Sequence, residues 1–212
     1  MMKRKIYLLR HGEIDRSYQG RFVGQTDLPL TDTGELQARF WEHELSEALF
    51  SRIHCSDLAR SLNTAQIIAG SNRIPIEITP ELREINLGEW DGLPVSDIKS
   101  HFPDEWRTRG ENLASYRPPG GESFSDLASR VVPVFVSIVK NAEGNLLIVG
   151  HAGVNRVILC HALGMPLANL FRICQDYGCM NILELSGDSF RLKTMNILSS
   201  VRSCKPTIAV RP

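Results

Sequence analysis

The sequence predicts an α/β fold in which strands of a parallel sheet alternate with helices. Residues 145–150, Asn-Leu-Leu-Ile-Val-Gly, form a continuous apolar run that is typical of a central parallel strand. Two further predicted strands, at 6–9 and 52–56, also end in polar residues directly before a loop or helix. At 212 residues, the chain is predicted to form one domain with a full hydrophobic core.

Hydrophobic periodicity and turn residues give the order of elements in the first half of the chain. Thr31 or Asp32 is the predicted N-cap of the first helix, and Ser56 or Asp57 that of the second. The predicted elements are a strand at 6–9, a glycine-punctuated loop at 14–29, a helix at 31–48, a strand at 52–56, a helix from 56 onward and a strand at 74–78.

The second half begins with a carboxylate-rich loop that also carries large apolar residues and is therefore expected to be partly buried. Ser123 and Asp126 have the spacing of a capping box at the start of a long helix. The predicted elements are this loop at 80–92, a lid or insertion at 94–119 with a short helix at 95–101, the helix from 123, the strand at 145–150, a helix at 154–163, a hairpin of 180–185 with 190–195, and a loose tail at 203–212.

Bulk composition limits the classes of partner. The formal net charge is 0, which argues against nucleic acid or an anionic membrane as a partner. The cysteines number five and none has CxxC spacing, so we expect free thiols. The apolar run near the N-terminus stops at Arg10, which is short for a signal sequence, and no apolar stretch approaches the roughly 20 residues of a membrane span. These features predict a cytoplasmic protein.

Three of the predicted strands lead into residues suited to binding and transferring phosphate. They are followed by Arg10-His11, by Ser56 with Arg60, and by His151. Because the carboxyl ends of parallel strands lie at one edge of a sheet, these residues are expected to meet there. We interpret His11 as a nucleophile toward phosphorus and Arg10 as a phosphate ligand. Gly12 is expected to let the chain turn and to bring backbone N–H groups close to the ligand.

This set of residues fits phosphoryl transfer through a phosphohistidine. One neutral imidazole attacks, the other histidine donates to a phosphate oxygen, and the arginines bind the remaining oxygens. A carboxylic acid protonates the leaving oxygen and then acts as a base on water. From the residues alone, Glu81, Glu84, Glu89 and Asp91 all compete for that role.

Each candidate also has a purely structural interpretation. His11 could cap or pack, Arg60 could be a solvated helix residue, and His151 could be a core histidine with its hydrogen bonds satisfied. His11 and His151 could also bind a metal ion, but no HExxH motif or aspartate cluster accompanies them.

Taken in order, five motifs resemble the histidine phosphatase superfamily, the phosphoglycerate mutase-like family. The resemblance covers about residues 5–196. The motifs are Arg10-His11-Gly12-Glu13, the run at 24–31, the run at 55–65, the Leu-Arg-Glu-Ile-Asn-Leu-Gly-Glu-Trp-Asp-Gly stretch at 82–92, and Gly150-His151-Ala152-Gly153-Val154.

The resemblance implies a three-layer α/β/α sandwich with a mostly parallel central sheet. It implies that His11 is the phosphorylated nucleophile and that Arg10, Arg60 and His151 form the phosphate pocket. It selects Glu84 as the general acid and base, because Glu84 occupies the Leu-x-Glu position of the motif. It also implies that the reaction needs no metal ion, and we expect no cofactor.

The loop after the nucleophile departs from the family pattern at two positions. Ile14 stands where Thr or Ser is frequent, and Ser17 stands where a phosphate-binding Asn is common. Neither departure affects the reacting residues, but both bear on which substrate fits. The predicted substrate-binding residues are Ser17, Arg21, Gly24, Gln25 and Ala152.

Within the family the chain most resembles the α-ribazole phosphatase branch, through its compact length and the Pro118-Pro119-Gly120-Gly121-Glu122-Ser123-Phe124 segment. The predicted function is therefore hydrolysis of a small phosphorylated substrate, α-ribazole 5′-phosphate in the leading hypothesis. The alternatives are a phosphoglycerate mutase, a sugar-phosphate or fructose-bisphosphate phosphatase, and a non-catalytic phospho-ligand binding module. For assembly the hypothesis is a homodimer.

Overall fold

The computed structural model describes residues 4–70, 74–187 and 189–200, and its centre is a six-stranded sheet. The strand order is β3-β2-β4-β1-β5-β6. Neighbouring strands among β1 to β4 are parallel, whereas β5 is antiparallel to β1 and β6 to β5, so the predicted mostly parallel sheet is confirmed. The strands are β1 (Arg4–Arg10), β2 (Phe50–Cys55), β3 (Ile76–Ile78), β4 (Asn145–Gly150), β5 (Met180–Ser186) and β6 (Ser189–Ile197).

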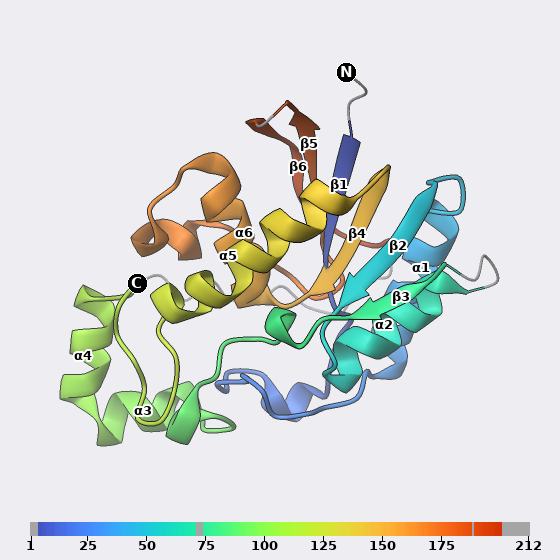
Figure 1. The fold of residues 1–212 in the computed structure, drawn as a ribbon. Coiled ribbons are helices and arrows are strands. Elements are labelled where there is room, and N and C mark those ends of the chain that lie inside the picture. Colours follow the sequence, from blue (N-terminus) through green and yellow to red (C-terminus); the bar gives the residue numbers. More distant parts are fainter. Residues whose placement is uncertain (1–3, 71–73, 188, 201–212) are drawn as a thin grey trace.

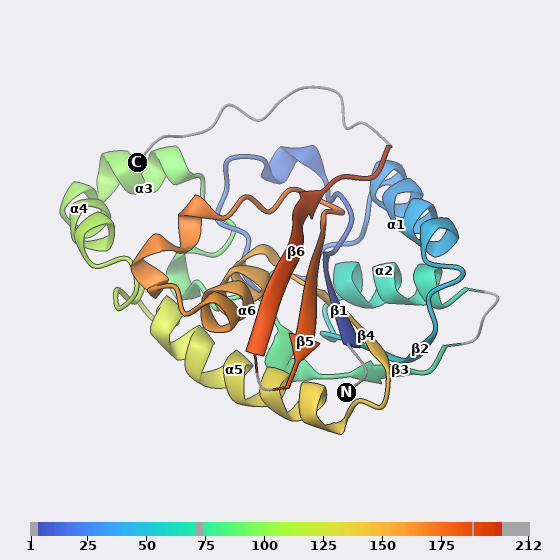
Figure 2. The ribbon, with the colours of Figure 1, turned by 90° about the horizontal axis from the view of Figure 1, so that it is seen from above.

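Helices cover both faces of the sheet. They are α1 (Asp32–Glu44), α2 (Ala59–Ala69), α3 (Val95–His101), α4 (Pro103–Glu111), α5 (Phe124–Asn141) and α6 (Ala152–Leu163). Short 3₁₀ turns lie at Arg16–Tyr18, Pro80–Leu82, Gly88–Trp90 and Leu167–Arg172. Helices α1 and α2 lie on one side of the sheet and α5 and α6 on the other (Figures 1 and 2).

Alternating side chains of the central strands fill two separate cores. Leu8 and Ile148 pack with the apolar residues of α5 and α6. Their neighbours Leu9 and Val149 point to the opposite face and pack with residues of α1 and α2, such as Trp41. This alternation is what a strand buried on both faces requires. The three-layer α/β/α sandwich is therefore confirmed.

Two helix boundaries differ from the prediction. Helix α1 ends at Glu44, four residues before the predicted Ala48. Helix α2 begins at Ala59, and its N-cap is Leu58, which makes no side-chain cap hydrogen bond. The expected caps are engaged elsewhere, because the Ser56 hydroxyl contacts His151 and the Asp57 carboxylate pairs with Arg83. Thr31 does cap α1, and the Ser123–Asp126 capping box is present at α5.

The predicted lid region folds as two short helices, α3 and α4, which stand together at one end of the molecule (Figure 1). The predicted tail at 203–212 lies outside the described residues, as does Cys204. The cysteines within the described ranges, Cys55, Cys160, Cys174 and Cys179, are free thiols. Over these same ranges no helix has both the length and the apolar character needed to cross a membrane.

Candidate active site

The candidate site lies where β1, β2 and β4 end side by side. Arg10 is in register with Gly150, and the backbone N–H of His11 donates to the Gly150 carbonyl at 3.0 Å. This pairing places the residue after β1 beside the residue after β4. The rings of His11 and His151 are therefore 5.1 Å apart between centroids, at an interplanar angle of 60°.

The His11 imidazole is buried, with 3% of the residue exposed. Its Nδ1 lies 2.8 Å from the Gly12 carbonyl oxygen, which can only accept a hydrogen bond, so Nδ1 carries the proton. Nε2 then keeps its lone pair. Burial, followed by the nearby Arg60, His151 and Arg10, holds the pKa of His11 well below its usual value, so the ring is neutral near pH 7.

The role expected for Gly12 is corrected by its contacts. Its backbone N–H donates to the Thr64 hydroxyl at 3.2 Å and is not directed at a ligand. A Cβ at Gly12 would lie 2.4 Å from the Gly34 carbonyl oxygen, in the first turn of α1. Glycine is therefore required because the turn after His11 packs directly on a helix backbone.

His151 is fully buried at the start of α6. Its Nε2 lies 2.7 Å from the Ser56 hydroxyl, whereas Nδ1 has no hydrogen-bond partner among the described residues. Burial and then Arg60 and Arg10 lower the pKa of His151 well below its usual value. A neutral His151 whose Nε2 accepts from Ser56 presents an Nδ1–H donor to the site.

Arg60 is buried, with 1% exposed, so the solvated-helix interpretation is wrong. Its Nη1 donates to the Thr26 carbonyl and its Nη2 to the Gly24 carbonyl, both at 2.7 Å. That loop is held in turn by Asp91, whose carboxylate accepts from the N–H groups of residues 24, 25 and 26 at 2.9–3.0 Å. Among the described residues, Arg60 is thus oriented by carbonyls and forms no direct ion pair.

Arg10 is held by the segment that precedes β5. Its Nη1 donates to the Gln175 carbonyl at 2.6 Å, and its guanidinium carbon lies 3.7 Å from the centre of the Tyr177 ring. Three polar atoms around His11 remain buried without a hydrogen-bond partner in the described part of the chain: Arg10 Nε, Arg60 Nε and His151 Nδ1. Such groups are unfavourable unless an acceptor reaches them, and a phosphate supplies several oxygen acceptors.

Among the competing carboxylates, only Glu84 is buried next to these groups. It is 7% exposed, and its two oxygens accept from the backbone N–H of Ile85 at 2.9 Å and of Gly153 at 3.0 Å. A Cβ at position 153 would lie 2.4 Å from Glu84 Oε1, so this approach needs glycine. Glu81 and Glu89 are exposed, and Asp91 binds its loop.

The predicted substrate-binding residues are distributed unevenly. Gly24 and Gln25 belong to the loop that holds Arg60, and the Gln25 side chain donates to the Glu84 carbonyl at 3.1 Å. Ala152 begins α6 beside His151. Ser17 is exposed, and exposed Arg21 donates to the carbonyls of Ser17 and Gly92 at 3.1 and 2.9 Å. Both differ in their exposure from His11, Arg60 and His151, which are buried.

Sequence reasoning missed three residues near the site: Gln175, Tyr177 and Arg156. Arg156 follows Ala152 by four residues on α6, so helical spacing could have indicated it. Its Nε donates to the Ile173 carbonyl at 2.9 Å, and its pKa is lowered by burial and then by Arg10, with Glu84 acting in the opposite direction. Gln175 and Tyr177 had no local signal.

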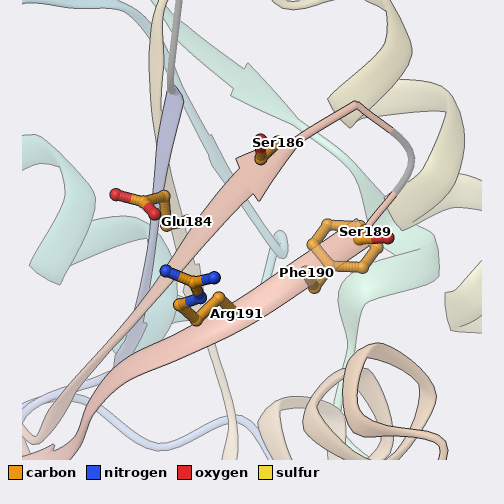
Figure 3. Close-up of a pocket in the computed structure, with 5 residues that line it drawn as sticks. All are labelled: Glu184, Ser186, Ser189, Phe190 and Arg191. Carbon is orange, nitrogen blue, oxygen red and sulfur yellow. The ribbon is translucent and has the colours of Figure 1, made fainter.

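Two other observations delimit the site. Within residues 4–70, 74–187 and 189–200 no group of three or more His, Cys, Asp or Glu side chains could hold a metal ion. A small hollow also lies on the β5–β6 hairpin, where Glu184 and Arg191 are cross-strand neighbours (Figure 3). None of the residues that line it, Glu184, Ser186, Ser189, Phe190 and Arg191, belongs to the predicted site.

Comparison with known proteins places the chain among phosphatases. The family model described as histidine phosphatase superfamily (branch 1) matches residues 6–198. An adenosylcobalamin/alpha-ribazole phosphatase of Salmonella typhimurium is 32% identical over 199 residues, covering 91% of this chain and 96% of that protein.

Solved structures agree with this match. The alpha-ribazole phosphatase from Shigella flexneri superimposes with a TM-score of 0.83 at 27% identity, covering 91% of this chain and 96% of that one. A mycobacterial glucosyl-3-phosphoglycerate phosphatase in complex with VO3 superimposes with a TM-score of 0.82 at 28% identity, covering 91% and 98%.

Proposed function

We propose that this chain, which belongs to the histidine phosphatase superfamily and is a phosphatase, hydrolyses a small phosphate monoester through a phosphohistidine at His11. One observation carries the proposal. A buried imidazole with a free Nε2 lies among three buried polar atoms that lack partners in the described structure, those of Arg10, Arg60 and His151. An anion is the ligand that would satisfy all three.

In the first step, the substrate phosphate accepts hydrogen bonds from Arg10, Arg60 and His151. The lone pair of His11 Nε2 attacks phosphorus, a P–N bond forms, and the P–O bond to the leaving group breaks. Glu84, in its carboxylic acid form, gives its proton to the leaving oxygen and becomes a carboxylate. The backbone N–H groups of Ile85 and Gly153 orient Glu84 for this transfer.

In the second step, the Glu84 carboxylate takes a proton from a water molecule as that water attacks phosphorus. The P–N bond breaks, its electron pair returns to His11 Nε2, and inorganic phosphate is released. The depressed pKa of His11 supports both steps, because a neutral ring is the attacking form and also the form that departs.

For the substrate, we propose α-ribazole 5′-phosphate, used in assembling the cobalamin nucleotide loop. The support comes from phosphatases of that name at about 30% identity that are matched over most of their length, such as that of Salmonella typhimurium. The residues 118–124 that suggested this branch lie against the carboxylate loop, where the Glu122 carboxylate accepts from the Asn86 N–H at 2.9 Å. The homodimer stays a prediction, which light scattering of the purified chain tests.

The test is phosphate release from a metabolite panel in EDTA. The panel contains α-ribazole 5′-phosphate, 2- and 3-phosphoglycerate, fructose 2,6-bisphosphate and phosphoserine. We expect release by the wild type, a loss of at least about 10⁴-fold in His11→Ala, and wild-type activity in the exposed control His43→Ala. Trapped phosphoenzyme should be acid-labile and alkali-stable.

Each alternative function predicts a different result in this panel. Interconversion of the phosphoglycerates without phosphate release would indicate a mutase. Preference for fructose 2,6-bisphosphate would indicate a sugar bisphosphatase. Binding without turnover, with His11→Ala behaving like the wild type, would indicate a binding module and overturn the proposal.

A further inference from the structure

The Arg10 guanidinium is fixed by one short segment of chain, residues 175–177. The Gln175 carbonyl accepts from Nη1 at 2.6 Å, and the Tyr177 ring lies 3.7 Å from the guanidinium carbon, close enough for face-on stacking. The hydrogen bond fixes one corner of the group and the ring fixes its plane. Nε, which has no partner in the described structure, takes its direction from these two contacts.

The same Tyr177 ring also lies beside the nucleophile. Its centroid is 5.6 Å from that of His11, at an interplanar angle of 52°. Backbone pairing sets this position, because the Gly178 N–H donates to the His11 carbonyl and the Arg10 N–H donates to the Cys179 carbonyl, both at 3.0 Å. Tyr177 therefore lies beside both Arg10, the last residue of β1, and His11, the residue that follows it.

A buried amide network holds the segment in place. The Gln175 Oε1 accepts from the side-chain amides of Asn155 and Asn181, each at 3.1 Å. The Gln175 Nε2 donates to Asn181 Oδ1 at 2.8 Å, and Asn181 also donates to the Leu8 carbonyl in β1 at 3.1 Å. Asn155 is on α6, one turn after His151. The network thus ties the support of Arg10 to the two elements that carry the histidines.

From this geometry we infer that Tyr177 is a positioning residue of the phosphate pocket, which acts by holding the Arg10 guanidinium in the plane that binds phosphate. The Asn155–Gln175–Asn181 network keeps Tyr177 and the Gln175 carbonyl in position beside the end of β1. The inference rests on the proposed function for its biological meaning but not for its test, because phosphate affinity can be measured without turnover. Hydrogen-bond donors must be held within roughly 10–20° to bind productively.

The experiment measures the affinity of inorganic phosphate by calorimetry for the wild type, Tyr177→Phe and Tyr177→Leu. Phe keeps the ring, so we expect its affinity to stay within about twofold of the wild type. Leu removes the stacking face, so we expect a loss of about tenfold. Tyr7→Leu is the matched control, because Tyr7 is a buried ring in β1 that packs on Phe50, away from the site. Thermal melting confirms that each variant is folded.

A double-mutant cycle with Arg10→Ala separates positioning from simple packing. If Tyr177 acts through Arg10, Tyr177→Leu should weaken phosphate binding by less than about twofold once Arg10 is absent. An equal loss in both backgrounds would overturn the inference, as would a loss in Tyr177→Phe equal to that in Tyr177→Leu.

A second variant covers the case in which Tyr177→Leu does not fold. Tyr177→His keeps a flat ring, and the inference expects it to retain more affinity than Tyr177→Met, which has similar bulk and no ring. The reverse order would overturn the inference. If the wild type binds phosphate but hydrolyses no ester, the proposed function fails while the role of Tyr177 can still be decided.

Discussion

The phosphate end of the site and the region around α3 and α4 are built in opposite ways. His11, Arg60, Glu84 and His151 are all buried, and each makes a side-chain hydrogen bond: His11 with the Gly12 carbonyl, Arg60 with the Gly24 carbonyl, Glu84 with the Gly153 N–H and His151 with the Ser56 hydroxyl. At the other end, the loop after His11 pairs with the residues that lead into α3. The backbone hydrogen bonds there run from Val95 N–H to the Gly20 carbonyl at 2.9 Å, from Phe22 N–H to the Leu93 carbonyl at 2.9 Å and from Gly92 N–H to the Phe22 carbonyl at 2.7 Å. Several side chains of that region are exposed, among them Ser17, Arg21 and Phe102.

The arginines of the two regions also differ in the groups that surround them. The arginines of the phosphate end are held by carbonyls, whereas Arg109 of α4 lies among the rings of Phe22, Trp106 and Phe171, at 5.7, 5.2 and 5.7 Å. Among the described residues no carboxylate pairs with it. From this difference we expect the proposed chemical step to depend on a rigid centre, and substrate choice to vary in the exposed region without disturbing that centre.

The largest effect that tests this difference between the two regions is expected at Glu84, in the phosphate end. Glu84→Gln keeps the size of the side chain but cannot transfer a proton, so we expect kcat to fall by about 10²–10⁴-fold. Phosphate affinity should change by no more than about threefold. Steady-state kinetics and calorimetry measure the two quantities. Glu89→Gln, in an exposed turn, is the control, and a comparable loss there would show that the acid is misassigned.

The next largest effect is expected in the free energy of unfolding at acid pH. The pKa values of His11 and His151 are depressed in the folded state by burial and then by Arg60, so the unfolded chain binds more protons just below pH 6.5. The free energy of unfolding should therefore fall as pH drops from about 6.5 toward the folded pKa values, by up to about 1.4 kcal/mol per pH unit for each histidine. Urea denaturation between pH 7 and pH 5 measures this slope.

The control for this pH dependence of the free energy of unfolding is the double variant His11→Asn/His151→Asn. Neither asparagine titrates, so the double variant should lose stability less steeply as the pH falls, whatever its stability at pH 7. Equal slopes for the two proteins would contradict the depressed pKa values.

A smaller effect, on KM, is expected in the exposed region around α3 and α4. Arg109→Leu should change KM for phosphate esters by a few-fold, roughly the strength of a cation–π contact, and leave the affinity of inorganic phosphate unchanged. Arg107→Leu, on the same helix and paired with Asp104 at 2.7 Å, is the control. A fall in phosphate affinity in Arg109→Leu would mean that the two ends are not independent.

The smallest effect concerns stability alone. Ser123→Ala removes the capping box of α5 and should lower the free energy of unfolding by about 1 kcal/mol with kcat unchanged. Ser129→Ala, at an exposed position within α5, should have almost no effect on either quantity. Urea denaturation and kinetics on the same preparations decide the result, and a lowered kcat in Ser123→Ala would link α5 to the centre.

The sequence was informative where local patterns determine structure. Apolar runs predicted β1 and β4, the short stretch at 52–56 predicted β2, and the polar residues at the ends of these strands predicted which side chains meet at the sheet edge. The start of α2 was predicted too early, because Ser56 and Asp57 look like caps locally but are bound by His151 and Arg83. Only tertiary structure reveals that competition.

The remaining site residues could not be predicted, because their contacts are long-range. Arg10 and Gln175 are 165 residues apart, and their hydrogen bond exists only because β5 returns antiparallel beside β1. Backbone N–H groups near Gly12 were expected to face a ligand, whereas the N–H of Gly12 itself binds Thr64, 52 residues away. No periodicity or motif around Tyr177 indicates such contacts.

The loop at residues 24–26 connects the buried Arg60 guanidinium to the Asp91 carboxylate through the backbone. The peptide unit between Gly24 and Gln25 donates its N–H to Asp91, and its carbonyl accepts from Arg60. One peptide dipole thus lies between an anion and a cation that do not touch, and each end polarises the other. Asp91 thereby fixes the carbonyl that Arg60 binds, and the Nε of the guanidinium keeps no partner in the described structure and is left for a ligand.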